Sequence, residues 1–119
     1  MSTAATILSV VLGAAFLGAG GTKLANVGPH EAEFERYRLP ALPAQTARMA
    51  VGMVELLAAL LLIVGAIASS SGVAVVGAVI VILAMLGALG THLRLGDKPP
   101  QMAPAALLAV VAVLVLVLA

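Results

Sequence analysis

Hydrophobic residues follow one another in four long runs, and three short segments between the runs hold most of the polar residues. The runs cover residues 3–21, 46–68, 72–93 and 102–119. Each is long enough, or nearly so, to cross about 30 Å of hydrocarbon at about 1.5 Å per residue. The pattern therefore predicts an all-α fold, a four-transmembrane-helix bundle, with residues 1–119 as a single domain.

Composition agrees with a membrane protein. Of the 119 residues, 63% are hydrophobic and only 9% are charged, a balance well outside that of soluble domains. The first run has no Lys or Arg before Leu8 and continues past the length of a signal sequence, so we interpret it as a retained span. The chain has no cysteine, which excludes disulfides and thiol redox chemistry.

The basic residues predict the orientation in the membrane. All six lie in or beside the segments that follow the first and third runs, whereas residues 69–72 between the second and third runs carry no charge. The positive-inside rule places the basic segments in the cytoplasm and both termini outside, in a multi-pass protein of the plasma (inner) membrane. Acidic residues are interspersed among the basic ones, so we expect the lipid bilayer as a partner and no nucleic acid. The basic residues are Lys23, Arg36, Arg38, Arg48, Arg94 and Lys98.

The segment between the first and second runs contains a predicted short interfacial helix over residues 29–39. Its spacing puts His30, Phe34 and Tyr37 on one face. This face favours an interfacial anchor that rests on the bilayer, and the alternative is a lid that closes the mouth of the bundle. Pro40 ends the helix and turns the chain toward the second span.

Glu55 is the only charged residue between residues 50 and 68. It shares one narrow helical face with Arg48, Gly52 and Ala59, so this face is expected to contact protein and not lipid. A charge at mid-bilayer costs about 2.5–3.5 kcal/mol on insertion scales. Glu55 is therefore expected to pair with a base, to be protonated, or to face a water-filled cavity.

Three bases lie within reach of Glu55 at the cytoplasmic side. Arg48 is two turns away on the same face, and Lys23 and His92 end the first and third spans. Glycines before Lys23 let the end of the first span approach its neighbours closely and carry the lysine deeper. The candidate ligand-binding residues are Glu55, Arg48, Lys23, His92 and, from the loop helix, Tyr37.

Each candidate also has a structural interpretation. Glu55 can fix helix register, Lys23 and Arg48 can snorkel as topology signals, and His92 can cap its helix. We predict no catalytic residue. We also predict no metal or haem, because only one histidine lies in a span and no set of ligands completes a site.

Three stretches carry a family resemblance. They are Gly-Gly-Thr-Lys-Leu at residues 20–24, Gly-Met-Val-Glu-Leu at 52–56, and Met-Leu-Gly-Ala-Leu-Gly-Thr-His at 85–92. In this order and spacing, the chain resembles the DoxX-like family of small four-helix membrane proteins over nearly its whole length. The resemblance implies a four-helix membrane bundle.

The resemblance does not imply one reaction, because relatives include a subunit linked to thiosulfate:quinone oxidoreduction, oxidative-stress proteins and assembly or cargo factors. One hypothesis is that the chain binds a small amphipathic or redox-active ligand, a quinone or a lipid, in support of a membrane redox or stress-defence process. It would then be an accessory subunit of a quinone-linked oxidoreductase, not an enzyme by itself. The alternative is a non-catalytic membrane partner that assembles or stabilises another complex, or that associates with its own copies.

Overall fold

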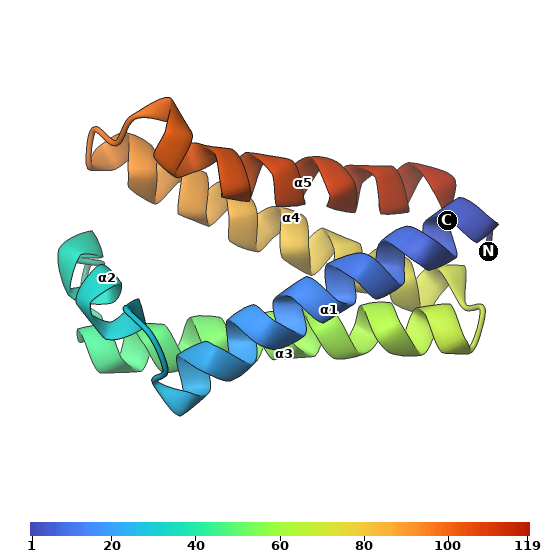
Figure 1. Ribbon diagram of the computed structural model, residues 1–119, viewed down its shortest axis with the longest axis horizontal. Coiled ribbons are helices and arrows are strands. Elements are labelled where there is room, and N and C mark those ends of the chain that lie inside the picture. The colour runs from blue at the N-terminus through green and yellow to red at the C-terminus, as the bar shows by residue number, and fades with distance from the viewer.

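The computed structural model describes all residues, 1–119, and consists of helices without strands (Figure 1). Four helices are long and apolar enough to cross a membrane, and the remaining one is short. The predicted all-α fold with four spans, and with a short helix between the first two, is confirmed. The helices are α1 (Thr3–Ala25), α2 (His30–Tyr37), α3 (Ala44–Ile67), α4 (Ser71–Arg94) and α5 (Pro99–Leu118).

The helix ends differ from the hydrophobic runs because local chemistry sets them. α1 continues to Ala25, where Asn26 adopts a left-handed conformation (φ 53°) and the N–H of Val27 donates to the carbonyl of Thr22. This is the Schellman arrangement that ends many helices. α5 begins at Pro99, before its hydrophobic run, because proline suits the first turn of a helix.

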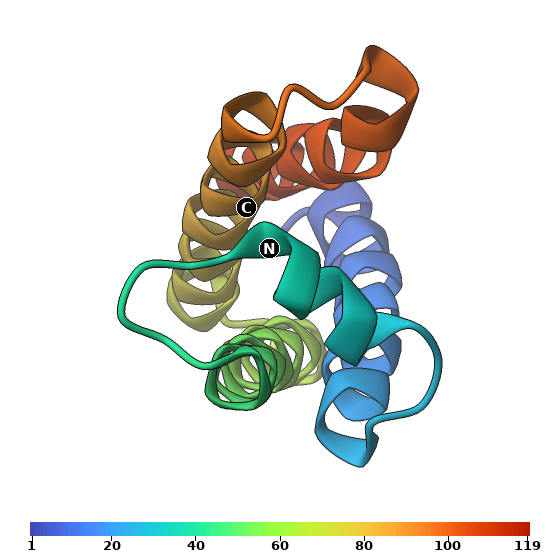
Figure 2. The same ribbon diagram turned by 90° about the vertical axis from the view of Figure 1, so that its left-hand side faces the viewer.

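The four spans form a ring. α1 packs on α3, α3 on α4, α4 on α5, and α5 returns to α1. Figure 1 places both chain termini at one end of this ring and α2 at the other. Seen from that other end, α2 lies across the opening between the spans (Figure 2). The short helix is therefore positioned as a cover for one end of the bundle.

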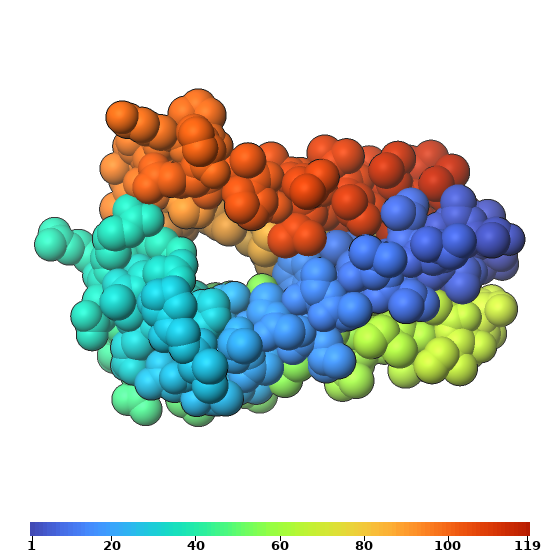
Figure 3. Space-filling view, viewed as in Figure 1, coloured from blue at the N-terminus to red at the C-terminus, as the bar shows by residue number.

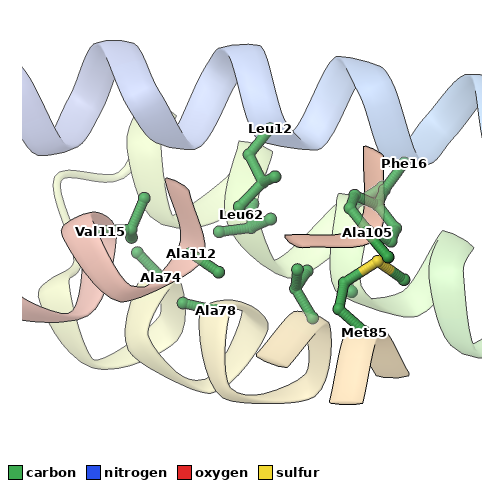
Figure 4. Close-up of a cluster of buried hydrophobic side chains, with 12 residues drawn as sticks. Leu12, Phe16, Leu62, Ala74, Ala78, Met85, Ala105, Ala112 and Val115 are labelled. Atoms are coloured by element: carbon green, nitrogen blue, oxygen red, sulfur yellow. The ribbon is translucent and has the colours of Figure 1, made fainter. Parts of the chain in front are cut away.

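The hydrophobic core fills the bundle away from α2. Leu12 and Phe16 of α1 and Leu62 of α3 are its large members, each at most 1% exposed. They pack with small residues of α4 and α5, as Figure 4 shows for Ala78 and Ala112. Small side chains allow membrane helices to pack closely, and the core is correspondingly tight at the end of the molecule opposite α2.

Candidate functional site

A cavity of about 570 Å³ lies between α2 and the ends of the spans. α2, α3 and α4 supply most of its walls, and Lys23 is the only contribution from α1. Ten of its seventeen lining residues are hydrophobic, and Met85 separates it from the core. The surface of the molecule is open at this end between α2, α1 and α5 (Figure 3). This mostly apolar cavity with a few polar groups is typical of a small-molecule site.

Lys23 and Glu55 form an ion pair in the wall of the cavity. Lys23 Nζ lies 2.8 Å from Glu55 Oε1, and the two side chains are 15% and 4% exposed. Glu55 stands near the middle of α3, at the depth where a charge without a partner is most costly in a membrane. The ion pair is the only polar contact of Glu55 within the protein. Even Oε1, the oxygen nearest Lys23, makes no hydrogen bond of good geometry. Pairing with a base, the first of the three predicted states, is thus the one observed.

The close crossing of α1 and α3 brings this lysine to the carboxylate. A Cβ on Gly20 would lie 2.7 Å from the carbonyl oxygen of Gly52, so the helices meet backbone to backbone. By contrast, a Cβ on Gly18 or Gly21 would meet nothing within 4 Å. Of the three glycines before Lys23, Gly20 alone provides the predicted close approach.

Arg48 is placed differently from the prediction. It is 4% exposed, but it does not line the cavity. Its guanidinium donates a hydrogen bond to the backbone carbonyl of Lys23. This carbonyl belongs to the last turn of α1, where carbonyls lack a partner within the helix and the helix dipole is negative, so the positive guanidinium stabilises the helix end. The expected buried face of Arg48, Gly52, Glu55 and Ala59 is observed. Arg48 therefore positions Lys23 from behind the cavity wall.

The aromatic face of α2 points into the bundle. Phe34 is 6% exposed, and its ring meets Tyr37 edge to face with centroids 5.1 Å apart. Both rings line the cavity, as does His30. The preferred expectation that this face rests on the bilayer was wrong, and the alternative of a lid was right. The spacing of the aromatic residues does not distinguish an anchor from a lid, because the bilayer and the mouth of the bundle would each cover the same face of the helix.

Polar contacts hold α2 to the end of α1. His30 Nε2 lies 3.0 Å from the hydroxyl of Thr22, and Asn26 Nδ2 donates to Glu31 Oε2 at 3.0 Å. The left-handed turn at Asn26 places these groups opposite each other. The first turn of α2 is thereby fixed beside Lys23.

The other end of α2 is held by the α4–α5 connection. Arg36 donates two parallel hydrogen bonds to Asp97, each of 3.0 Å, and Arg94 donates to the carbonyl of Tyr37. Bidentate arginine–carboxylate pairs are the strongest of such contacts. The Arg36 guanidinium, followed by His92, lowers the pKa of Asp97 to about 2, so this carboxylate is ionised at neutral pH.

His92 is oriented by the same carboxylate. Its Nδ1 lies 2.6 Å from Asp97 Oδ2, and its ring stands edge to face with Tyr37 at a centroid distance of 6.1 Å. Gly96, at φ 71°, makes the turn that folds Asp97 back, with the Asp97 N–H donating to the His92 carbonyl. A carboxylate at Nδ1 favours a proton on that nitrogen, and Nε2 makes no hydrogen bond within the protein. His92 is one of the residues that line the cavity.

Tyr37 adds a hydroxyl group to the wall. It donates to Glu33 Oε2 at 3.1 Å. Burial, reinforced by the negative charge of Glu33, raises the pKa of Tyr37 to about 12. The phenol therefore keeps its proton at any physiological pH and serves as a hydrogen-bond donor.

Four of the five candidate residues, Lys23, Tyr37, Glu55 and His92, surround one cavity, and Arg48 lies outside it. Sequence reasoning missed Asp97, whose signal was its place directly after a helix-ending glycine, five residues beyond His92. It also missed Glu33 and Arg36, since only the tertiary contacts of α2 distinguish them from surface charges. No three Asp, Glu or His side chains converge as they would around a metal ion.

These features define a class: an integral membrane protein of four spans, with a mostly apolar cavity that holds a few polar groups under a short helix at one end. The model of the DoxX-like family matches residues 7–115, nearly the whole chain. The protein belongs to the DoxX-like family, as its three sequence stretches indicated. Searches of curated proteins and of solved structures gave no match.

Proposed function

We propose that the protein binds a small amphipathic molecule, a quinone or a lipid, in the cavity between α2 and the spans. The observation that carries this proposal is the Lys23–Glu55 pair, which stands in the wall of an otherwise largely apolar cavity of about 570 Å³. Sites for small molecules commonly enclose about 300–1,000 Å³ and combine apolar walls with a few polar groups. A buried ion pair with so few other contacts is better explained by a ligand than by stability, since such pairs contribute little net stability.

The polar groups suit a molecule with carbonyl or hydroxyl oxygens. Lys23 is a donor and Glu55 is an acceptor. The Tyr37 hydroxyl gives its proton to Glu33, so its oxygen is left to accept a hydrogen bond from a ligand. His92, whose Nδ1 is engaged with Asp97, has Nε2 left. Carboxylate and imidazole side chains, the types that Glu55 and His92 supply, are those that proteins use for proton transfer, which a quinone requires when it is reduced or oxidised. The electrons would come from a partner enzyme. We therefore place the chain as an accessory subunit in a membrane redox or stress-defence process, and not as an enzyme by itself.

The orientation is part of the proposal. All six basic residues lie at or near the α2 end of the molecule: on α1, on α2 and the residue after it, on α3, at the end of α4 and in the α4–α5 connection. The positive-inside rule then puts the cavity mouth and its lid in the cytoplasmic half of a plasma (inner) membrane, with both termini outside.

A second function has one observation in its favour. α5 is the least buried of the four spans, and it packs only on α4 and α1. This exposed span offers a surface for another membrane protein, or for a second copy, in the role of a non-catalytic assembly partner.

The test is native mass spectrometry of the protein released from nanodiscs, with extraction of the molecules that accompany it. Wild type is compared with Glu55→Gln, and with Glu35→Gln as a control, because Glu35 is exposed and makes no ion pair or side-chain hydrogen bond. We expect a quinone or lipid on the wild type and the control, and its loss from Glu55→Gln. If no form carries a small molecule and Glu55→Gln changes only stability or copy number, the assembly role replaces this proposal.

A further inference from the structure

The cavity reaches the outer surface between α3 and α4. Val54 and Leu83 both line it, and they are 43% and 64% exposed in total, whereas the core residues of the same helices are closed off. Both stand near the middle of their helices, so their exposed sides face the hydrocarbon of the bilayer. The cavity therefore has an edge in contact with lipid, separate from the opening between α2, α1 and α5 in Figure 3.

Glycines show where this seam between α3 and α4 is closed and where it is open. A Cβ on Gly65 would lie 2.6 Å from the backbone of Ala74, and one on Gly77 would lie 3.0 Å from Leu62. At those positions the two helices leave no room. Gly87, three turns further along α4, is exposed and lines the cavity, and a Cβ there would meet nothing within 4 Å. The seam is open beside the cavity and closed beyond it.

The basic side chains beside the cavity are already engaged. Each of the four bases named below has an acidic or carbonyl partner within the protein, so none of these four is free to neutralise a phosphate or carboxylate of a ligand. An anionic head group would have to break one of these pairs, whereas an uncharged head with carbonyl or hydroxyl groups would not. The pairs are Lys23 with Glu55, Arg36 with Asp97, Arg48 with the Lys23 carbonyl, and Arg94 with the Tyr37 carbonyl.

We propose that the seam beside Gly87 is a lateral portal for an uncharged amphiphile with a single apolar chain. Its head lies in the cavity beside Lys23 and Glu55, and its chain leaves between α3 and α4 into the hydrocarbon of the bilayer. This rests on the proposed function, that the cavity holds an amphipathic molecule, and it adds the charge of the head and the route of the chain.

The protein contains its own reporter for this site. Tyr37 lines the cavity, and the chain has one tyrosine and no tryptophan. Quinones quench tyrosine emission at short range, so a benzoquinone with a ten-carbon chain is a suitable probe for titration in nanodiscs of phosphatidylcholine. The loss of Tyr37 fluorescence then reports quinone close to Tyr37, and comparison of the variants distinguishes binding in the cavity from quenching by quinone in the bilayer.

The decisive variant is Gly87→Leu, which adds a bulky side chain at the portal from a position where a Cβ meets nothing within 4 Å. Its matched control is Gly90→Leu on the same helix, where a Cβ also meets nothing within 4 Å but the residue does not line the cavity. We expect Gly87→Leu to weaken binding of the probe by about tenfold or more, which is about 1.4 kcal/mol or more, while Gly90→Leu stays near wild type. If Gly87→Leu does not fold, Ala50→Leu fills the portal from α3, since Ala50 is exposed and lines the cavity.

Each contrary result has a separate meaning. Equal binding by Gly87→Leu and Gly90→Leu overturns the portal and leaves the cavity site standing, with entry between α2, α1 and α5. Displacement of the probe by added phosphatidylglycerol, but not by phosphatidylethanolamine, overturns the preference for an uncharged head. No quenching of the wild type overturns the portal and the proposed function together.

Discussion

The backbones of Gly20 and Gly52 touch where α1 crosses α3. A Cβ on Gly20 would lie 2.7 Å from the Gly52 carbonyl oxygen, and one on Gly52 would lie 3.1 Å from that of Gly20. Only glycine permits this approach at both positions, since any other residue carries a Cβ. The crossing carries the last turn of α1 against α3, and Lys23 reaches Glu55 as a result.

We expect Gly20→Ala to destabilise the protein, although alanine is the better helix former. The added methyl must push apart two backbones, and overpacking of this kind costs about 1–3 kcal/mol. The free energy of unfolding can be measured by titration with sodium dodecyl sulfate in mixed micelles. Gly21→Ala is the control, because its methyl meets nothing within 4 Å, and it should be neutral or mildly stabilising. Equal loss of stability in both variants would contradict a tight crossing.

Removing the base from the ion pair should destabilise the protein more than removing both charges. Lys23→Met leaves the Glu55 carboxylate buried without a partner, for which the cost in free energy of unfolding is about 3–5 kcal/mol. In the double variant Lys23→Met/Glu55→Leu no charge remains, and we expect most of the stability to return. A double-mutant cycle under the same unfolding conditions measures the coupling. Simple additivity of the two single changes would show that the side chains do not interact.

Acid should release the lid. The pKa of Asp97 is lowered from 3.8 to about 2 because Arg36 and His92 stabilise its charged form. The stabilisation is complete above about pH 4 and is lost as the pH falls through about 2. Tyr37 fluorescence, followed from neutral to acidic pH, should change across this interval. Asp97→Asn should lack the transition and show the altered emission already at neutral pH, and Glu35→Gln should keep the wild-type profile.

Tyr37, the single tyrosine, should lose its proton at a higher pH than a free tyrosine does. Burial, together with Glu33, raises its pKa from 10 to about 12, and the tyrosinate absorbance measures this directly. Because the unfolded chain loses the proton at about pH 10, the folded form loses stability as the pH rises from about 10 to about 12. Glu33→Gln should lower the midpoint, but not fully to 10, since burial is the larger cause. A wild-type midpoint at 10 would mean that α2 does not cover Tyr37.

Labelling of single introduced cysteines tests the orientation in the membrane. The chain has no native cysteine, so only the introduced one can react. Ala68→Cys lies at the exposed end of α3, and Glu35→Cys lies on the exposed face of α2. A thiol reagent that cannot cross the membrane should label Ala68→Cys on intact cells and Glu35→Cys only after permeabilisation. The opposite pattern would reverse the proposed orientation.

Much of the fold was readable from the sequence because membrane spans are encoded by local properties. Hydrophobic length alone predicts four helices, and the isolated charge of Glu55 predicts a face turned toward protein. The pairing of Glu55 with a base followed from the cost of burying a lone charge. Lys23 was one of three bases considered, and the glycine-rich end of α1 was the clue that it could reach so deep.

The sequence did not predict which surface the aromatic face of α2 contacts, nor which group Arg48 binds. The aromatic face of α2 fits a bilayer and a bundle mouth equally well. The choice depends on tertiary contacts, above all that of Arg36 with Asp97, which is distant in sequence, and also that of His30 with Thr22. Arg48 shares a helical face with Glu55. Because α1 ends next to Arg48, the guanidinium donates to the Lys23 carbonyl and does not reach the cavity. Such outcomes depend on where helices cross, which hydrophobic pattern does not specify.

The cavity occupies only the half of the bundle nearer α2, whereas the core around Leu12 and Leu62 fills the other half. The α3–α4 seam follows the same division, being open at Gly87 and closed at Gly65. A molecule held in this cavity therefore exchanges with a single leaflet. If the proposed binding holds, then in a cell whose two leaflets differ in composition the cavity would exchange lipids and lipid-soluble cofactors with one monolayer and not with the other.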